Sequence, residues 1–190
     1  MKKLPVLFVL ALLSFAVSAA PQVKLATNMG DIVIELDTEK APLSSENFLQ
    51  LAASGYYDGV IFHRVMDNFM IQGGGFNSDM QQRPRRPTIR NEAANGLRNV
   101  AGSLAMARTS DPHSASAQFF INLKDNAFLD YPGRDGWGYA VFGKVVKGFD
   151  VVQMIAKVAT GANGMHRNVP IKPVIIRTAT ILNNKQDNPQ

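Results

Sequence analysis

The stretch FHRVMDNFMIQGGGF, residues 62–76, decides the fold class and the kind of site that this chain carries. Its short apolar and aromatic runs, which begin at Val60, predict strands, and the glycines at 73–75 indicate a β-bulge or a close approach of the backbone. A phosphate loop is excluded, because the glycines lack a Gly-Lys-Ser/Thr ending and a following helix. Arg64 is a permanent cation among large apolar side chains. The stretch therefore predicts strands that carry a site for a nearly neutral substrate.

A second segment, QFFIN at residues 118–122, repeats the combination of an amide with aromatic side chains. Neither segment contains an obvious nucleophile. Together the two segments predict catalysis by binding and polarisation of the substrate rather than by covalent attack.

Hydrophobic periodicity predicts the elements around these segments. Alternating residues at 22–25 and 31–36, on either side of turn residues, predict an opening β-hairpin. A helix is expected from Pro42, in its first turn, to a glycine cap at Gly55. Helical spacing recurs at 150–158. Further strands are expected at 103–107, 118–122, 139–146 and 173–182.

Polar segments connect these elements. Residues 77–99 are rich in Asn, Arg, Gln and Pro, which is typical of a surface connection, and loops are expected at 109–117 and 124–138. Short strands with only two, widely separated helices argue against alternating βαβ units and for an antiparallel barrel or sandwich. We favour a barrel capped by helices, as one domain over residues 21–182 with a flexible tail at 183–190.

The first twenty residues differ from the rest and predict a secretory signal peptide. Two lysines precede an apolar run at 6–17, and the small residues 18–20 follow it. This run is too short to span a bilayer comfortably. Cleavage is expected after Ala19, with Ala20 as the alternative. We therefore expect a bacterial periplasmic protein that is soluble and free of the membrane after cleavage, and secretion is the less favoured alternative.

Size, charge and cysteine content restrict the possible functions. Of the 190 residues 46% are hydrophobic, enough for one substantial core. Loss of the two leader lysines lowers the formal charge from +5 to +3, which is too modest to indicate nucleic-acid binding. The basic run RPRRP at 83–87 lacks aromatic residues and predicts a solvated loop. Zero cysteines exclude disulfides, thiolate catalysis and Cys-based zinc sites.

The histidines give no sign of a metal site or of a hydrolase. There are three of them, widely spaced: His63, His113 and His166. We interpret His63 as structural. Asp111, Ser114 and Ser116 lie near His113, but no nucleophile-elbow motif surrounds them. No metal or organic cofactor is expected.

Five motifs, in this order and spacing, carry a resemblance to a known family: FHRVMDNFMIQGGGF (62–76), NEAANGLRNVAGSLAMAR (91–108), SAQFFIN (116–122), NAFLD (126–130) and YAVFGKVVKGFDVV (139–152). Through them the chain resembles the cyclophilin-type peptidyl-prolyl isomerases over residues 22–182, and specifically an exported bacterial form. The resemblance implies a mainly β fold, a closed eight-stranded antiparallel barrel capped by two α-helices, with the site on its outer face.

The resemblance also implies the site residues. By position in the motifs, the catalytic residues are Arg64 and Gln72, and the substrate-binding residues are Phe69, Met70, Ala107, Arg108, Gln118, Phe120, Phe128, Leu129 and Tyr139. Three of them depart from the commonest pattern: Phe128 replaces tryptophan, Tyr139 replaces histidine and Arg108 replaces asparagine. Because Phe128 lacks an indole N–H, we expect cyclosporin binding to be weak at most. The resemblance places Phe120 in the pocket, and strand alternation then leaves Phe119 inward.

Rotation of an X–Pro bond suits such a site. The amide resists rotation with a barrier of ~20 kcal/mol because of its partial double-bond character. In the twisted state the nitrogen regains its lone pair, so a donor near the nitrogen binds that state better than either planar isomer. We expect Arg64 to be the donor and Gln72 to orient it. The apolar proline pocket is expected to consist of Phe69, Met70, Phe120 and Leu129.

The expected partners are proline-containing segments of exported proteins, bound by a monomer. Two alternatives to an isomerase stay open in the sequence. A binding module would capture the same segments in the same groove with little turnover, and a peptidase would cleave them.

Overall fold

The computed structural model describes residues 19–182. The predicted signal peptide, apart from Ala19 and Ala20, and the predicted tail at 183–190 lie outside the described residues. No helix within residues 19–182 is both long and apolar enough to cross a membrane.

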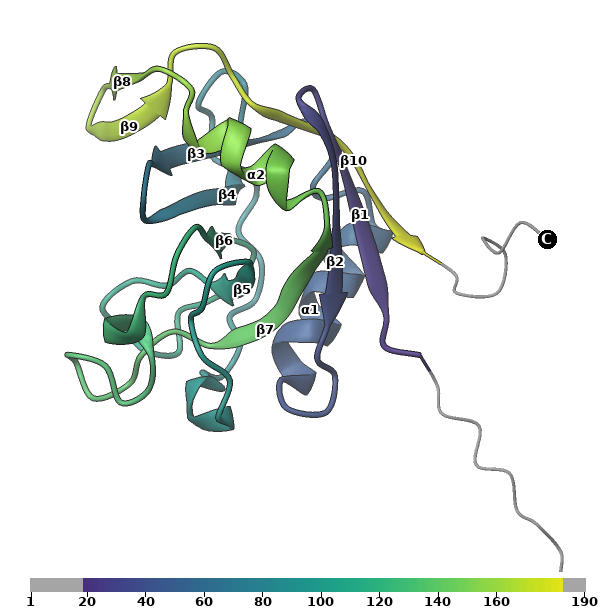
Figure 1. Cartoon of the computed structure of the whole chain (residues 1–190), viewed down its shortest axis with the longest axis vertical. Helices are drawn as coiled ribbons and strands as arrows, with labels where there is room; N and C mark the ends of the chain where they lie inside the picture. The colour runs from purple at the N-terminus through teal and green to yellow at the C-terminus, as the bar shows by residue number, and fades with distance from the viewer. Residues whose placement is uncertain (1–18, 183–190) are drawn as a thin grey trace, which may run out of the picture.

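Eight antiparallel strands close into a barrel in the spatial order β1-β10-β3-β4-β6-β5-β7-β2 (Figure 1). The barrel strands are β1 (Gln22–Thr27), β2 (Gly30–Leu36), β3 (Val60–Met66), β4 (Met70–Asn77), β5 (Ser103–Met106), β6 (Phe119–Asn122), β7 (Val141–Lys147) and β10 (Ile175–Leu182). Every neighbouring pair in the ring is antiparallel. The predicted fold class is therefore confirmed, and the sandwich alternative is excluded.

The β1–β2 hairpin shows how alternation in the sequence becomes barrel wall. Alternate residues of β1, Val23 and Leu25, are fully buried, because successive side chains of a strand point to opposite faces. The hydroxyl of Thr27 closes the turn, donating to the carbonyl of Gly30 at 2.6 Å and accepting from the backbone N–H of Met29 at 3.0 Å. The predicted hairpin follows from this alternation and this turn.

Two helices close the barrel interior, as predicted. α1 (Pro42–Ala53) packs against β7 and β10, and α2 (Phe149–Ala156) packs against β2, β3 and β4. Their apolar faces join the buried cluster that fills the barrel, through side chains such as Phe48, Leu51, Val152 and Ile155.

The N-terminus of α1 is capped from a distant part of the chain. The carboxylate of Glu92 accepts hydrogen bonds from the backbone N–H groups of Leu43 and Ser44 at 2.9 and 2.8 Å. A carboxylate in this place satisfies N–H groups that lack a partner within the helix and interacts favourably with the helix dipole. At the other end Gly55, just after the helix, adopts a φ of +67°, the left-handed conformation expected of a glycine cap.

A two-stranded sheet outside the barrel, β8 (Thr160–Asn163) with β9 (His166–Pro170), was not predicted. The sheet packs on β3 through β9 and projects at one end of the molecule in Figure 1. Every residue of β8 is exposed, so no alternation of apolar and polar residues marks this strand in the sequence.

The glycines at 73–75 combine a strand irregularity with a close backbone contact, the two possibilities that the sequence left open. The β3–β4 pairing shifts register on either side of Phe62. Gly74 has a φ of +90°, and a Cβ atom there would lie 2.5 Å from the carbonyl oxygen of Ala117. A Cβ atom on Gly75 would lie 2.5 Å from Nε2 of Gln118 and would clash with that side chain. The glycines therefore let the segment before β6 lie directly on β4.

Candidate active site

Alternation along β4 and β6 divides their side chains between the two faces of the barrel wall. Ile71 and Phe119 belong to the cluster that fills the barrel, whereas Met70 and Phe120 belong to a smaller apolar cluster on the other face. Phe119 therefore points inward and Phe120 outward, as the strand alternation predicted. The smaller cluster has Met70, Ala105, Phe120, Leu129 and Val141 at its centre, with Met66, Phe69, Leu97, Ala107 and Tyr139 packed around them.

A cleft of about 180 Å³ opens over this outer cluster. Its lining residues are Arg64, Phe69, Met70, Gln72, Ala107, Arg108, Phe120, Leu129 and Tyr139. The structure thus brings nine of the eleven predicted site residues into one cleft, although they are spread along the chain from residue 64 to residue 139. The other two, Gln118 and Phe128, lie at its margins.

Each of the two marginal residues contacts a residue of the lining. Gln118 accepts a hydrogen bond through Oε1 from Nε2 of Gln72 at 2.9 Å. The ring of Phe128 stacks on that of Phe69, with 5.8 Å between centroids and 22° between planes. Phe128 is 47% exposed, so it forms an apolar rim of the cleft rather than its floor.

Arg64 is the cation on the polar side of the cleft. Its Nη1 donates to Oε1 of Gln72 at 3.4 Å, and its Nη2 contacts the sulfur of Met66 at 3.2 Å. One long bond and one weak thioether acceptor leave most of the donor capacity of the guanidinium for a ligand. Gln72 donates onward to Gln118, which keeps its carbonyl oxygen turned to Arg64. This chain of contacts, the Arg64–Gln72–Gln118 relay, sets the direction of the guanidinium.

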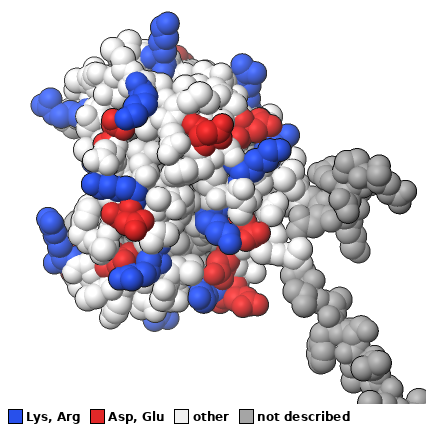
Figure 2. All heavy atoms as spheres, in the orientation of Figure 1, with Lys and Arg blue, Asp and Glu red and all other residues white. Residues whose placement is uncertain are grey.

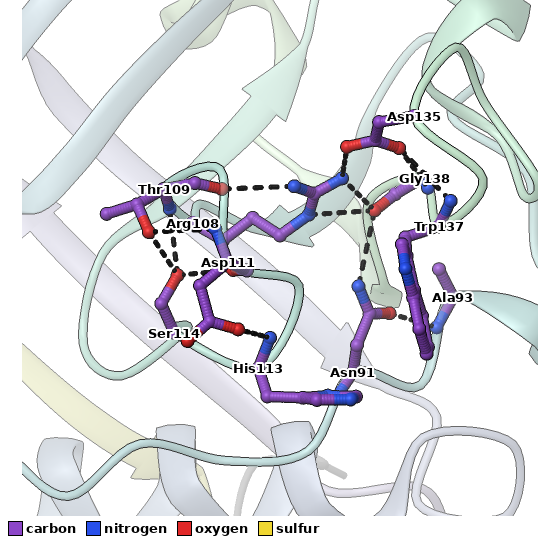
Figure 3. Close-up of polar contacts among 10 residues, drawn as sticks. All are labelled: Asn91, Ala93, Arg108, Thr109, Asp111, His113, Ser114, Asp135, Trp137 and Gly138. Atoms are coloured by element: carbon purple, nitrogen blue, oxygen red, sulfur yellow. Dashed lines mark hydrogen bonds and ion pairs between the residues drawn. The ribbon is translucent and has the colours of Figure 1, made fainter.

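Arg108 is a second cation in the lining, and its surroundings differ from those of Arg64. Its side chain is only 2% exposed. The guanidinium donates to the carbonyls of Thr109 and Gly138 and pairs with the carboxylate of Asp135 (Figure 3). Its N–H groups are therefore committed within the protein, whereas the sequence pointed to a direct contact with the substrate.

Buried asparagines hold the wall of the cleft, and the sequence analysis missed them. Asn126, which is 1% exposed, donates from Nδ2 to the carbonyl of Phe69 at 3.0 Å and to Oδ1 of Asn122 at 2.7 Å. Asn122 donates in turn to Asn99 and Ser103. A buried amide is costly unless it is hydrogen-bonded, so this network fixes the backbone at Phe69. The available signal was one asparagine in each of the motifs SAQFFIN and NAFLD.

His63 adjoins Arg64 along β3 with its own side chain buried. Its ring packs on Phe76 with 4.7 Å between centroids, and Phe76 packs on His166 at 5.0 Å. Burial, with smaller effects from the charges of His166 and Arg64, lowers the pKa of His63 to about 4. The imidazole is therefore neutral at neutral pH, in keeping with a structural role.

The residues around His113 do not form a catalytic triad. Nδ1 of His113 accepts a hydrogen bond from the backbone N–H of Asn91 at 3.2 Å. Asp111 accepts from the backbone N–H of His113 rather than from its ring, and the hydroxyl of Ser114 donates to the carbonyl of Asp111 (Figure 3). A triad needs a carboxylate on the imidazole and the imidazole on the hydroxyl. These contacts close a turn and do not support a hydrolase.

Two other features of the described residues offer less chemistry than the cleft. Within residues 19–182 no three His, Cys, Asp or Glu side chains come together to hold a metal ion. A larger cavity, about 470 Å³, lies between β2, β7 and the segment around residues 97–103. Lys144 in its lining pairs with Glu35 at 3.2 Å. We therefore place the chemistry in the smaller cleft, where a cation with free donor capacity meets an apolar surface.

Solved structures share this fold. A cyclophilin type peptidyl-prolyl cis-trans isomerase from Cryptosporidium parvum matches with a TM-score of 0.71 and 29% sequence identity, over 87% of this chain and 99% of that one. A second structure of that protein, in the presence of the dipeptide Ala-Pro, matches with a TM-score of 0.70 at 29% identity, over 86% and 99% of the two chains. The fold and the cleft thus define a protein of the cyclophilin class.

Sequence comparison identifies the family. Residues 22–181 match the family described as cyclophilin type peptidyl-prolyl cis-trans isomerase/CLD. A peptidyl-prolyl cis-trans isomerase of Streptomyces antibioticus is 57% identical over 162 residues, which cover 84% of this chain and 98% of the relative. Peptidyl-prolyl cis-trans isomerase B of Escherichia coli is 55% identical over 157 residues, covering 82% and 96%. The chain belongs to the cyclophilin-type peptidyl-prolyl cis-trans isomerase family.

Replacing Gly75 by alanine is expected to displace the amide of Gln118, because the new Cβ would come within 2.5 Å of its Nε2. The displaced atoms are the end of a flexible side chain, so the fold should persist. Gln72 then loses the partner that turns its oxygen toward Arg64, and kcat/KM for X–Pro rotation should fall roughly tenfold. An isomer-exchange assay and a thermal melt of the same variant measure the two effects.

The contrasting variant is Gly74→Ala. Its Cβ would meet the backbone oxygen of Ala117, and a φ of +90° is strained for alanine. This variant should lose about 2 kcal/mol or more of stability. Parental activity in Gly75→Ala would show that Gln118 does not act through the relay.

Stability is expected to fall between pH 6.5 and about 4 because of His63. Its pKa in the folded state is lowered to about 4, so the unfolded chain binds the proton more readily across this range. The stability that comes from keeping His63 neutral is fully present above pH 6.5. About 3 kcal/mol of it is lost as the pH falls from 6.5 to about 4. Urea unfolding of the parent and of His63→Phe at pH 7 and pH 4.5 measures the effect.

His63→Phe should show a flatter pH dependence of stability than the parent, because the group with the lowered pKa is gone. Equal slopes for the parent and His63→Phe would contradict the assignment.

Proposed function

We propose that this protein accelerates cis–trans rotation about X–Pro peptide bonds, with Arg64 as the hydrogen-bond donor to the twisted amide. The observation that carries the proposal is the pairing of an under-used guanidinium with an apolar cleft on one barrel face. The relatives from Streptomyces antibioticus and Escherichia coli are named peptidyl-prolyl cis-trans isomerases, which supports the same activity here.

The chemistry requires little of the protein beyond positioning. The planar amide is held by a barrier of roughly 18–20 kcal/mol, and the twisted nitrogen becomes pyramidal and gains a lone pair that can accept a hydrogen bond. A guanidinium N–H aimed at that nitrogen stabilises the twisted state more than the planar isomers. No bond of the peptide is made or broken, so the step needs neither a nucleophile nor a proton transfer.

The apolar lining supplies the second part of the mechanism. Met70, Phe120 and Leu129 are almost completely buried and form the floor on which a proline ring would rest. Phe69 closes one side, with Phe128 stacked outside it. A proline ring resting there would displace water from this floor, and an apolar surrounding favours the less polar twisted amide over the planar form. Lowering the barrier by about 7 kcal/mol would accelerate rotation roughly 10⁵-fold.

Gln72 has two tasks in this proposal. Its oxygen holds Arg64 in direction, and its place in the cleft lining allows it to bond the substrate backbone. Tethering by Gln118 keeps the Gln72 amide from rotating, so the donor is positioned before the substrate arrives. A chain supplies every lining residue of its own cleft, so we propose that the monomer is the working unit.

The substitution of Arg64 tests the catalytic assignment. Arg64→Ala should reduce kcat/KM roughly 100-fold or more, the size expected when a transition-state donor is lost. Arg64→Lys keeps the charge but loses the planar fork of donors. Its kcat/KM should lie between those of the parent and the alanine variant. The measurement is NMR exchange between the cis and trans resonances of an Ala-Pro peptide, which also reports binding.

Arg177→Ala is the matched control, since Arg177 is exposed on β10, away from the cleft. Its activity should equal that of the parent. Full activity in Arg64→Ala would remove Arg64 from the mechanism. Binding of the peptide without accelerated exchange, in the parent protein, would identify a binding module instead, and a cleaved peptide would identify a peptidase.

We further propose that the protein works on exported polypeptides in the bacterial periplasm and supports their folding. The support is the composition of residues 1–20, which resembles a cleavable signal peptide. Cleavage near Ala19 or Ala20 would leave the barrel intact, because Pro21 is held by a hydrogen bond from the N–H of Leu36 to its carbonyl at 2.9 Å. Weak cyclosporin binding is part of the same proposal, since the ring of Phe128 at the rim offers no N–H donor.

The N-terminus of the purified protein tests export. Protein recovered from the periplasmic fraction of a Gram-negative host should begin at Ala20, or at Pro21 if cleavage follows Ala20. Edman sequencing or intact mass would measure this, and an intact Met1 on cytoplasmic protein would contradict export.

A further inference from the structure

Two arginines line the proposed proline cleft, and their different hydrogen-bond partners indicate different roles. Arg64 has one long bond and one sulfur contact. Arg108 uses all three of its guanidinium nitrogens: Nε donates to the carbonyl of Gly138 at 3.0 Å, Nη1 to the carbonyl of Thr109 at 3.0 Å, and Nη2 to Gly138 at 2.9 Å and to Asp135. A planar fork of donors suits such a set of fixed acceptors. Arg108 therefore has little donor capacity left for a ligand.

Three of the four hydrogen bonds of Arg108 go to one loop, residues 130–138. Asp135 accepts from Arg108 and, through its other oxygen, from the backbone N–H groups of Trp137 and Gly138 at 3.1 and 3.2 Å (Figure 3). The carbonyl of Gly138 also accepts from Nδ2 of Asn91 at 3.3 Å. The carboxylate and the guanidinium together hold the end of the loop from both sides.

This loop leads directly into Tyr139, a wall of the cleft. The guanidinium carbon of Arg108 lies 4.4 Å from the centroid of the Tyr139 ring, a cation–π contact. That ring also meets the ring of Phe120, edge to face, at 5.7 Å between centroids. The ring of Tyr139 is thus held between Arg108 and the floor of the cleft.

We propose that Arg108 is a positioning residue: with Asp135 it locks the loop at 130–138 and presses Tyr139 against Phe120, so that the cleft is formed before the substrate binds. The inference rests on the proposed function, because it concerns affinity for the X–Pro segment in the same site. It differs from the role that the sequence implied for Arg108, a direct contact with the substrate.

The two roles predict opposite behaviour for Asp135. If Arg108 touched the substrate, removing Asp135 would free its guanidinium, and binding would be unchanged or tighter. If Arg108 acts through the loop, Asp135→Asn breaks the same lock as Arg108→Gln. Preformed sites bind more tightly because less ordering is needed on binding, so both variants should weaken binding.

The experiment measures kcat and KM for an Ala-Pro peptide, and the peptide Kd by NMR titration, in Arg108→Gln, Asp135→Asn and the double variant. Each single variant should raise KM and Kd roughly fivefold while kcat falls less than about twofold. The reason is that the lost interactions favour the bound ground state and the transition state equally. The double variant should be no worse than either single one, since both remove one lock. Parental KM and Kd in Asp135→Asn would overturn the proposal.

Trp137 supplies a readout that does not depend on activity. It is the single tryptophan of the chain, it lies two residues from Asp135, and its ring meets His113 edge to face at 4.9 Å. Release of the loop should shift its fluorescence and increase quenching by acrylamide in both single variants. An unchanged Trp137 signal in both would also overturn the proposal.

Two further variants separate this lock from general damage and from the catalytic proposal. Asp31→Asn removes an exposed carboxylate in the β1–β2 hairpin, where it pairs with Lys24 at 3.7 Å. This variant should leave KM and the Trp137 signal at parental values. Arg64→Ala should lower kcat and leave the Trp137 signal unchanged, so failure of the catalytic assignment and failure of the loop lock are seen separately. If Arg108→Gln unfolds below the assay temperature, the single variants Arg108→Lys and Asp135→Asn provide the same test.

Discussion

The close approach of the segment before β6 to the glycines of β4 underlies both the barrel and the site. At Gly74 the backbone of Ala117 lies where any side chain would stand. At Gly75 the same space is taken by Gln118, whose amide then reaches Gln72 in the cleft. One steric condition, the absence of Cβ atoms, thus lets the sheet close between β4 and β6 and places an amide behind Gln72 and Arg64.

The barrel wall separates two kinds of packing within the same strands. Inward side chains fill the interior with α1 and α2, and outward side chains at alternate positions make the apolar floor of the cleft. The floor therefore shares the rigidity of the core. Part of its wall comes from loops, and polar side chains hold these loops: Asn126 ties the backbone at Phe69, and Asp130 ties that of Asn99 at 2.6 Å.

Two cations in one cleft are distinguished by their partners rather than by their charge. Arg108 is enclosed, and all three of its guanidinium nitrogens donate to groups of the protein. Within residues 19–182 Arg64 has one long hydrogen bond to an amide and one contact with a thioether, which leaves donor capacity on its guanidinium. The lowered pKa of Asp135, about 2, has the Arg108 guanidinium as its first cause, which keeps their ion pair intact throughout the neutral range.

Local periodicity and turn residues were sufficient to predict the opening hairpin, both helices and most barrel strands, because these signals act over a few neighbouring residues. The motifs, through their resemblance to a family, also indicated the residues that gather in the cleft. The tertiary structure alone decided contacts between distant segments: Glu92 on the end of α1, the exposed strand β8, and Asp135 as the partner of Arg108. Such pairs depend on distances that exist only after the barrel closes, and burial in that barrel, not the residue type, lowers the pKa of His63.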